Sequence, residues 1–304
     1  MKKNSLSLFI LALLALVASL QAQTYSYRIV NFPGVAESGL DSLNNSGAMV
    51  GVYSTTPACC LGPGFLLSNG SYKVIIYPGA IGTEPNGLNK NQTMVGGYTD
   101  SANLLHGFEL QGTKYKNIDY PGSTQSAADD INDHGFVVGG YYDGMHWHGY
   151  TLQSGKFVVL DYPGGGNTIL ASVNNSGQIA GYYYGDDMVS HGFSYSGGSF
   201  TQIDYPSSSQ TVVLGLNNLG EMSGSYADAT GNYHGFVLVS GSYTSLDFPG
   251  AVSTFAQGLN DSGEIVGIVT TDFSETTQGF LASPVPSGES RDSRQVMGKA
   301  LAGR

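Results

Sequence analysis

The sequence predicts an all-β fold, a six-bladed β-propeller of four-stranded antiparallel blades. Three observations predict it: six copies of a repeat of about 43 residues, short strand-like segments within each copy, and chain ends that complement each other. Of 304 residues, 44 are glycine and only 12% are charged. An apolar content of 41% suffices for a core, so a disordered chain is excluded.

Each copy of the repeat is anchored by a proline that follows an aromatic residue. Five residues after the proline comes Ser or Thr, eleven after it comes Asn, and seven after that Asn comes Gly. A Gly-aromatic pair follows, usually preceded by His. The six prolines, 42 to 45 residues apart, are Pro33, Pro78, Pro121, Pro163, Pro206 and Pro249.

Each copy divides into four strands. The first runs from the Ser or Thr to an aliphatic residue ten past the proline and ends at an Asn-Asn-Ser-Gly type turn, clearest at 174–177. The second is typified by 178–183, the third begins at the His-Gly-aromatic triplet, and an alternating fourth strand such as 200–205 ends at the next proline. All length variation between copies lies between the second and third strands.

The ends of the chain predict how the ring closes. The sixth copy has three strands through Phe280 and then meets Pro284, so it lacks a fourth. Tyr27 lies six residues before Pro33, the same offset as an aromatic residue in every complete fourth strand. We therefore expect the N-terminal strand to join the last blade, which leaves no open edge. The alternative fold, an open β-solenoid, does not explain why the N-terminal segment matches a fourth strand.

The first 22 residues are typical of a Sec-type signal peptide, with Lys2 and Lys3, an apolar run over 6–20, and Ala22. We expect export to an extracellular or periplasmic location and no membrane span in the mature chain. Residues 23–283 are expected to form one propeller domain, and 284–304 a disordered tail. Cys59 and Cys60 form either a vicinal disulfide or two unpaired thiols in a loop.

The charge balance limits the partners. Twenty-three acidic residues face twelve basic ones. A surface that cannot neutralise phosphates is not expected to bind nucleic acid or anionic lipid by charge.

The repeat also resembles a known family. The segment 259–267, Leu-Asn-Asp-Ser-Gly-Glu-Ile-Val-Gly, and the His-Gly-Phe or His-Gly-Tyr triplets are similar to the bacterial extracellular proteins of the His-Ala-Phe (HAF) repeat family, with Gly in place of Ala. The resemblance covers 27–283 and implies a secreted or surface repeat protein without an agreed activity. The His residues of the triplets are His106, His148, His191 and His234.

The loop between the second and third strands suggests a binding surface, because variable loops on a rigid frame are how repeat scaffolds form recognition sites. The only Trp lies in the shortest such loop, so Trp147, His146, Tyr142 and Asp143 are candidate contacts for carbohydrate or a cell-envelope component. The alternative is a Trp that fills a gap between blades.

The channel suggests a second site. The eighth residue after each proline is expected near one mouth of the central channel, where polar side chains could hold a hydrated cation such as Ca²⁺. Asp41 and Asp129 would be the carboxylates of a polysaccharide hydrolase or lyase. These six residues are Asp41, Asn86, Asp129, Ala171, Leu214 and Gln257.

Other polar residues are expected to be structural. The triplet histidines should hydrogen-bond within or between blades, since equivalent residues of neighbouring blades lie beyond metal-ligand reach. The aspartates two residues before four of the prolines, such as Asp119, should accept N–H groups of the turn that follows. Asp133, Asp186 and Asp187 are weak calcium candidates, explained equally well as solvated loop charge. No catalytic motif is found, so binding is expected rather than catalysis, and a purely structural surface protein is the third hypothesis.

Overall fold

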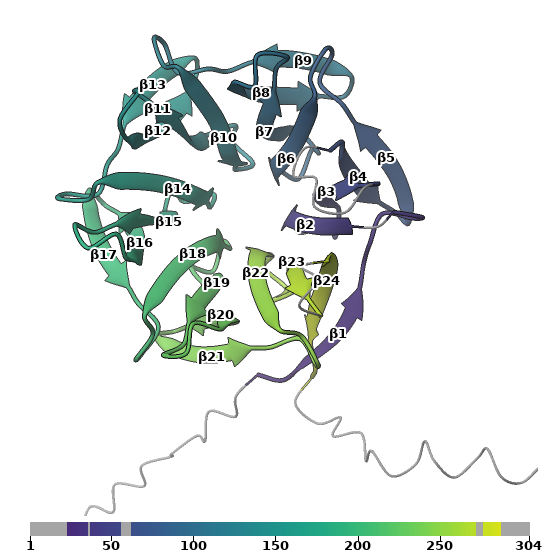
Figure 1. Cartoon of the computed structure of the whole chain (residues 1–304), viewed down its shortest axis with the longest axis vertical. Coiled ribbons are helices and arrows are strands. Elements are labelled where there is room, and N and C mark those ends of the chain that lie inside the picture. The colour runs from purple at the N-terminus through teal and green to yellow at the C-terminus, as the bar shows by residue number, and fades with distance from the viewer. Residues whose placement is uncertain (1–22, 36, 56–61, 272–275, 287–304) are drawn as a thin grey trace, which may run out of the picture.

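The protein is a six-bladed β-propeller. A computed structural model describes residues 23–35, 37–55, 62–271 and 276–286, in which six four-stranded antiparallel sheets surround one axis (Figure 1). The predicted fold class is therefore confirmed. No helix long and apolar enough to cross a membrane occurs within these ranges. The predicted signal peptide, the cysteine pair and residues 287–304 of the predicted tail lie outside them.

The strands of each blade run outward from the axis in chain order, except that the N-terminal strand is outermost in blade six. The innermost are β2 (Glu37–Leu43), β6 (Gly82–Leu88), β10 (Gln125–Ile131), β14 (Asn167–Val173), β18 (Gln210–Leu216) and β22 (Ser253–Leu259). The second are β3 (Met49–Ser54), β7 (Met94–Thr99), β11 (Val137–Tyr142), β15 (Ile179–Tyr184), β19 (Met222–Ala227) and β23 (Ile265–Thr270). The third are β4 (Gly64–Ser68), β8 (Leu105–Gln111), β12 (Trp147–Gln153), β16 (Ser190–Ser196), β20 (Tyr233–Val239) and β24 (Thr277–Pro284). The outermost are β5 (Ser71–Ile75), β9 (Lys114–Asn117), β13 (Lys156–Val159), β17 (Ser199–Ile203), β21 (Ser242–Leu246) and, in blade six, β1 (Tyr25–Ile29).

The N-terminal strand closes the ring as expected. Strand β1 pairs antiparallel with β24, with Ile29 opposite Phe280 and Tyr27 opposite Ala282. The Tyr27 ring meets Phe248 edge-on at 5.6 Å between centroids, the contact that the outer-strand aromatic residue makes in the other five blades. The two strands lie side by side at one edge of the ring in Figure 1. The offset of Tyr27 in the sequence therefore corresponds to the same packing position that the aromatic residue of each other outer strand occupies.

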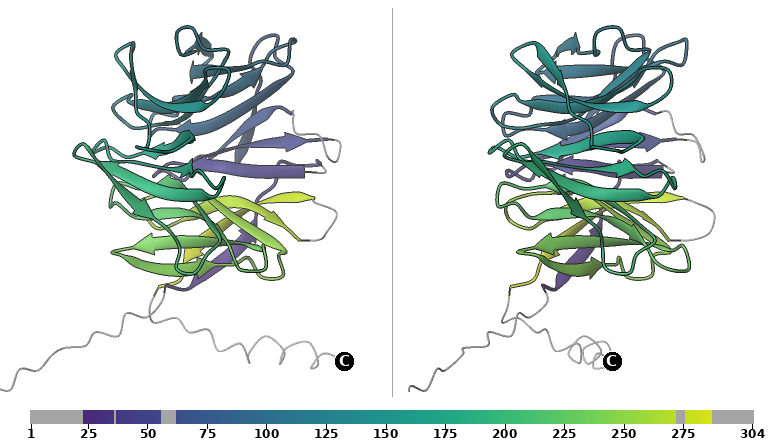
Figure 2. Two further views of the ribbon diagram at one scale, coloured as in Figure 1. Left: turned by 60° about the vertical axis from the view of Figure 1, so that its left-hand side comes forward. Right: turned by 90° about the vertical axis from the view of Figure 1, so that its left-hand side faces the viewer.

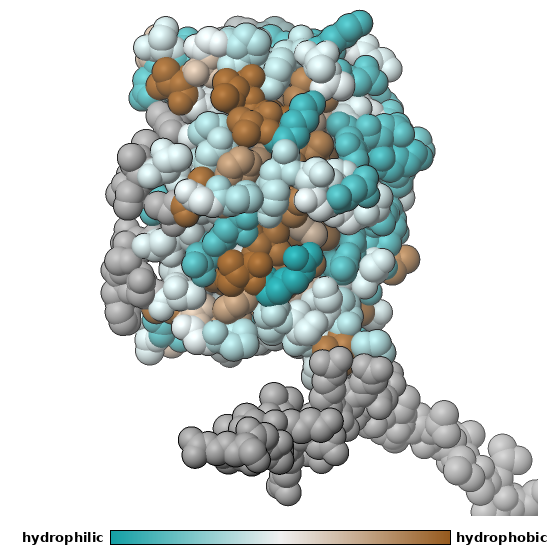
Figure 3. Space-filling view, turned by 90° about the vertical axis from the view of Figure 1, so that its right-hand side faces the viewer, coloured by the Kyte–Doolittle hydropathy of each residue, from teal (hydrophilic) through white to brown (hydrophobic). Residues whose placement is uncertain are grey.

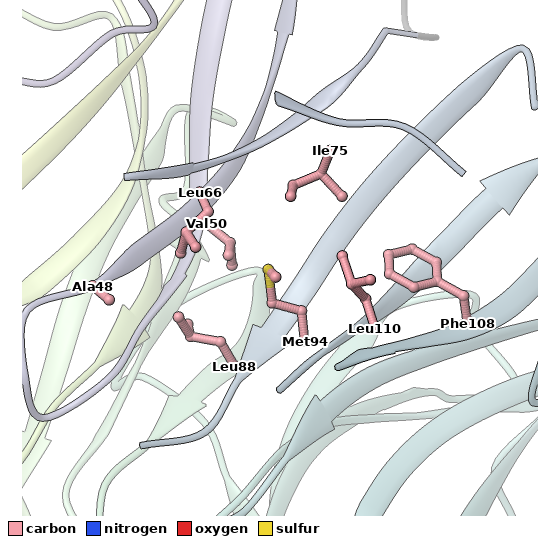
Figure 4. Close-up of a cluster of buried hydrophobic side chains, with 8 residues drawn as sticks. All are labelled: Ala48, Val50, Leu66, Ile75, Leu88, Met94, Phe108 and Leu110. Atoms are coloured by element: carbon pink, nitrogen blue, oxygen red, sulfur yellow. The ribbon is translucent and has the colours of Figure 1, made fainter. Parts of the chain in front are cut away.

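The hydrophobic core is divided into six clusters, each between two neighbouring blades. Between blades one and two, Val50, Leu66 and Ile75 face Leu88, Met94 and Phe108 (Figure 4). Each blade contributes apolar side chains from both of its faces, so no blade can bury its own core alone. Complete closure therefore stabilises every blade.

The faces of the ring differ in their connections. The side views of Figure 2 show loops on both faces of the disc. We call the face with the links from outer to inner strands and from second to third strands the connector face, and the opposite one the turn face. On the connector face, the Ser or Thr five past each proline is buried, and its hydroxyl accepts the N–H of the aromatic residue before the proline, as in Tyr77 to Thr83 at 2.9 Å. This bond fixes the entry into each inner strand.

Candidate functional site

The six side chains expected near the channel mouth owe their placement to a β-bulge. Every inner strand shifts register against the second strand at the eighth residue past the proline, as between Ala128 and Asp130. The extra residue has no partner in the ladder and points away from it, a common use of bulges near functional sites. The bulge requires a glycine on the second strand, because a Cβ at Gly139 would lie 2.2 Å from the Ala127 carbonyl oxygen.

These bulged residues line a cavity on the propeller axis, here called the axial cavity. It measures about 180 Å³ and includes all six residues. Blades one to three contribute Asp41, Asn86 and Asp129, whereas blades four and five contribute Ala171 and Leu214. One wall is therefore acidic and amide-rich, and the wall from blades four and five is mainly aliphatic, with the hydroxyls of Ser172 and Tyr182 beside Ile169, Ala171 and Leu214. Among the described residues that line it, none is basic.

Two carboxyls in this cavity are strongly perturbed. Burial, followed by the charge of Glu84, raises the pKa of Asp41 to about 7. Burial, followed by the charge of Asp130, raises the pKa of Asp129 to about 7. The Oδ2 atom of Asp41 is buried without a hydrogen-bond partner among the described residues, and the half-buried Asp129 makes no side-chain hydrogen bond to any of them. Such groups are candidates for ligand contacts, because proteins rarely leave buried carboxyls unpaired.

Asp130 shows what a structural carboxylate looks like at the same place. Its Oδ2 accepts the Ser172 hydroxyl at 2.8 Å and the Val173 N–H at 2.9 Å, and its Oδ1 accepts the Ile131 N–H at 2.8 Å. These bonds join blades three and four. Asp130 is thus a structural residue that sequence reasoning missed. The neighbouring Asp129 takes no part in these hydrogen bonds.

A ring of asparagines surrounds the channel on the turn face. The Asn eleven past each proline is buried, and in blades one to five its Nδ2 donates to the carbonyl of the equivalent Asn in the next blade at 3.0–3.4 Å. Its Oδ1 accepts two N–H groups of its own turn, as Asn132 does from His134 and Phe136. One residue thus shapes the turn and ties neighbouring blades together. The ring members are Asn44, Asn89, Asn132, Asn174, Asn217 and Asn260.

The next residue along forms a second ring, here called the turn-face ring. In blades two to six its backbone N–H donates to the side-chain oxygen of the equivalent residue one blade further, as from Asp133 to Asn175 at 2.9 Å. The chain of bonds stops between Asn45 and Lys90, since an ammonium cannot accept a hydrogen bond. The six residues are Asn45, Lys90, Asp133, Asn175, Asn218 and Asp261, and with the asparagine ring they line a cavity of about 220 Å³.

The triplet histidines hydrogen-bond within their own blades, which confirms their expected structural role. His106 Nδ1 lies 2.8 Å from Asp119 Oδ2, its Nε2 lies 3.4 Å from Asp100, and its ring stacks on Tyr98. Burial opposes the charged form, but the hydrogen bonds and charges of the two aspartates outweigh it and raise the pKa of His106. Blades three and five repeat this arrangement with His148 and His234.

The role expected for the aspartates before the prolines is wrong in one respect. Asp119 Oδ1 accepts the Gly107 N–H at 2.8 Å, and Asp161 accepts the Gly149 N–H at 2.9 Å. Both partners lie on the third strand of the same blade rather than in the following turn. In these two blades the carboxylate replaces a backbone carbonyl in the ladder, so the outer strand ends before it; β9, for example, ends at Asn117 rather than Tyr120. The fourth strand expected over 200–205 is also shorter, Ser199–Ile203.

The candidate loop site lies where blades three and four meet. Trp147 is partly buried; its backbone N–H donates to Asn167 of blade four at 2.7 Å, and its ring is 5.7 Å from that of Tyr142. Asp143 Oδ1 accepts the Met145 and His146 N–H groups, and its Oδ2 meets His148 at 3.3 Å. These bonds lower the pKa of Asp143 to about 2. Asp143 therefore holds its own loop, while the exposed His146 and the open part of the Trp147 ring stay candidate contacts.

Two of the three weak calcium candidates, Asp133 and Asp187, already have protein partners. Asp133 Oδ1 accepts the Lys90 N–H and Asp133 Oδ2 accepts Asn175 Nδ2, while Asp187 Oδ1 accepts the Val189 N–H. In the part of the chain that the structure describes, no group of three His, Cys, Asp or Glu side chains could hold a metal ion.

The outer rim carries scattered apolar side chains. Figure 3 shows them on the side that bears β5, broken up by hydrophilic residues. Val74, Ile76 and Ile81 are 42%, 52% and 50% exposed. Exposed aliphatic residues are ordinary on protein surfaces, so these three residues by themselves do not indicate a binding site.

Comparisons with known proteins support the fold. No protein-family model matches the chain, and no curated protein matches it. Among solved structures, it is similar to a mutant of AofleA from Arthrobotrys oligospora, with 14% identity and a TM-score of 0.52 over 82% of this chain and 84% of that one. A putative gluconolactonase shares 13% identity with a TM-score of 0.51, covering 86% of this chain and 92% of its own.

The β-propeller domain of the Trilobed protease from Pyrococcus furiosus shares 9% identity with a TM-score of 0.50, covering 82% of this chain and 97% of that one. It is described as having an open velcro topology, whereas here β1 closes the last blade. At these identities the similarity establishes the class alone: the chain is a β-propeller built from sequence repeats.

Proposed function

We propose that this protein is an exported binding scaffold that holds a small carbohydrate or other cell-envelope ligand in its axial cavity. The observation that carries the proposal is the pair of carboxyls, Asp41 and Asp129, that face this cavity without hydrogen-bond partners among the described residues. Asp130, at the next position, is fully paired, so the free pair is not a general property of the inner strands.

The chemistry of the two walls suits a sugar ring. Carboxyl and amide groups of Asp41, Asn86, Asp129 and Gln257 can bind hydroxyl groups, while Ala171 and Leu214 can cover an apolar ring face. The cavity of about 180 Å³ is smaller than the roughly 300–1,000 Å³ of drug-sized ligand sites, so it suits one ring rather than an oligosaccharide.

Calorimetric titration with a panel of monosaccharides tests the proposal. At pH 8, where Asp129 is ionised, we expect binding by the wild type that weakens at least about tenfold in Asp129→Asn, a loss typical of a charge-assisted hydrogen bond. Trp147→Ala is the comparison: if it alone abolishes binding, the site is the loop cluster with His146, Tyr142 and Asp143. If no monosaccharide or envelope fragment binds, the structural hypothesis gains.

Export is part of the proposal. It is supported by the signal-peptide pattern of residues 1–22 and by the resemblance to the HAF repeat family. N-terminal sequencing of the protein recovered from the medium or periplasm should begin at Gln23. A cytoplasmic protein that retains Met1 would contradict it.

A second function, polysaccharide hydrolysis or lysis, is favoured by one observation. Carboxyls with a pKa of about 7, as in Asp41 and Asp129, suit general acid–base catalysis near neutral pH. Release of reducing or unsaturated ends that stops in both Asp41→Asn and Asp129→Asn would establish it. Binding without turnover would leave the scaffold role.

A further inference from the structure

The axial cavity has an unbalanced charge. Asp41 lies near Glu84, and Asp129 lies beside Asp130, so four carboxyls gather around blades one to three. The nearby basic residue Lys90 belongs to the cavity on the turn face, where its Nζ is 3.9 Å from Asp133. Within the described lining of the axial cavity, no cation offsets these acids.

The apolar wall narrows the kinds of cation that fit. The side chains of Ile169, Ala171 and Leu214 carry no oxygen, so only backbone carbonyls and the hydroxyls of Ser172 and Tyr182 supply oxygens on this wall, whereas a calcium ion requires six to eight oxygen ligands. The described residues also contain no group of three acidic or imidazole side chains able to hold a metal. A cation with an organic body uses both walls, because its charge can face the carboxyls while its carbon atoms face the aliphatic residues.

We propose that the axial cavity binds a protonated primary amine carried on a small, partly apolar body, with its ammonium group between Asp41 and Asp129. This rests on the proposed function and specifies its ligand class. The amides of Asn86 and Gln257 then bind hydroxyl groups of the body. An amino sugar and a plain alkylamine share this chemistry, and the test separates them.

Proton release gives the amine a distinctive signature. The titratable groups around the two carboxyls are Glu84, Asp130, Tyr150 and Tyr182. None of these groups is a cation that would lower the pKa of the two carboxyls. Because the pKa of each carboxyl is about 7, both are mostly protonated at pH 6.5 in the free cavity. A bound ammonium favours the charged carboxylates and displaces those protons.

The experiment is calorimetric titration at pH 6.5 with glucosamine, glucose, N-acetylglucosamine, n-butylamine and calcium chloride, each in two buffers of different ionisation enthalpy. We expect glucosamine to bind at least tenfold more tightly than glucose and N-acetylglucosamine, with net proton release. Asp41→Asn and Asp129→Asn should each remove most of this preference, whereas the matched change Asp186→Asn, in an exposed loop, should leave it intact.

The outcomes separate the two proposals. Equal affinity for glucosamine and glucose overturns the amine inference and leaves the carbohydrate function standing. Binding of n-butylamine without glucosamine supports the amine chemistry and overturns the carbohydrate function. Calcium binding that is lost in the same variants, without amine binding, overturns the inference in favour of a metal, and no binding in any arm overturns both proposals.

Discussion

Asp41 and Asp129 lower the stability of the folded protein at neutral pH. Their pKa values of about 7 lie well above that of an aspartate in an unfolded chain, so the folded state binds more protons between about pH 4 and pH 7. Stability therefore falls as the pH rises through this window and levels off above it. A stabilising role at neutral pH therefore does not explain these residues, whereas the proposed ligand binding would.

The first prediction is that Asp129→Asn stabilises the protein at pH 8. Removing a half-buried charge that has no hydrogen-bond partner and lies beside Asp130 should raise the free energy of unfolding by on the order of 2 kcal/mol there, and change it much less at pH 5. Urea unfolding followed by tryptophan fluorescence measures both values. A variant less stable than the wild type at pH 8 would mean that the carboxylate has a structural partner.

Asp130→Asn provides the opposite result at the adjacent residue. Its carboxylate accepts three hydrogen bonds, two of them from blade four, and the amide nitrogen of Asn cannot accept any of them. We expect a loss of about 1–3 kcal/mol at pH 8. The two adjacent substitutions should thus shift the unfolding midpoint in opposite directions.

At the scale of the elements, the turn-face ring contains one gap. Five of its six positions carry Asn or Asp, and Lys90 interrupts the chain of hydrogen bonds that follows Asn45. Lys90→Asn should complete the ring and raise the free energy of unfolding by about 1 kcal/mol, the usual contribution of one hydrogen bond. Thermal unfolding by circular dichroism measures it, with Lys90→Gln as the control for loss of charge. Equal effects of the two would show that charge and not ring completion matters.

The His–Asp pairs hold the outer strands in a pH-dependent way. His148 lies between Asp161 and Asp143; burial opposes its charge, but the two carboxylates raise its pKa above 6.5. The stabilisation from this ion pair is complete below the unfolded pKa of about 6.5 and is lost as the pH rises through the folded value.

His148→Phe should therefore be destabilising by about 1–2 kcal/mol at pH 5.5 and by less at pH 8.5, since Phe keeps the stacking on Tyr141 but not the pairing. Differential scanning calorimetry at both pH values measures the difference. His146→Phe, at an exposed residue of the loop just before β12, is the control. A loss that does not vary with pH would show that only the shape of the ring matters.

The elements also show how far the sequence can predict such structures. The repeat positions of Pro, Asn and Gly predicted the strands and the turns, because these residues mark where a strand ends and the chain turns. The offset of Tyr27 from Pro33 predicted the closure. The bulge was not predictable, since register is set by pairing between strands rather than by either strand alone. The pairing of Asp119 with His106 was missed although both recur at a fixed spacing of thirteen residues, a signal that could have found it.

At the scale of the whole molecule, closure is the prediction with the largest expected effect. A chain that lacks residues 23–30 would expose the edge of β24 and lose the burial of Val30 and the contact of Tyr27 with Phe248. We expect the free energy of unfolding to fall by about 3 kcal/mol or more. A synthetic peptide of residues 23–31 should restore it in urea titrations, whereas a scrambled peptide should not. An unchanged midpoint without the strand would mean that β1 is dispensable.

The partnership of Tyr25 with Pro284 sets the order in which this protein can fold. A ribosome makes β1 first and β24 last, so the first strand must wait, unpaired, until nearly the whole propeller has been synthesised. Contacts between such distant residues form slowly, because a very long loop must lose conformational entropy before the contacts can stabilise it. The blades between them can assemble in sequence. The final step is the pairing of β1 with β24, and a chain that ends before β24 cannot make it.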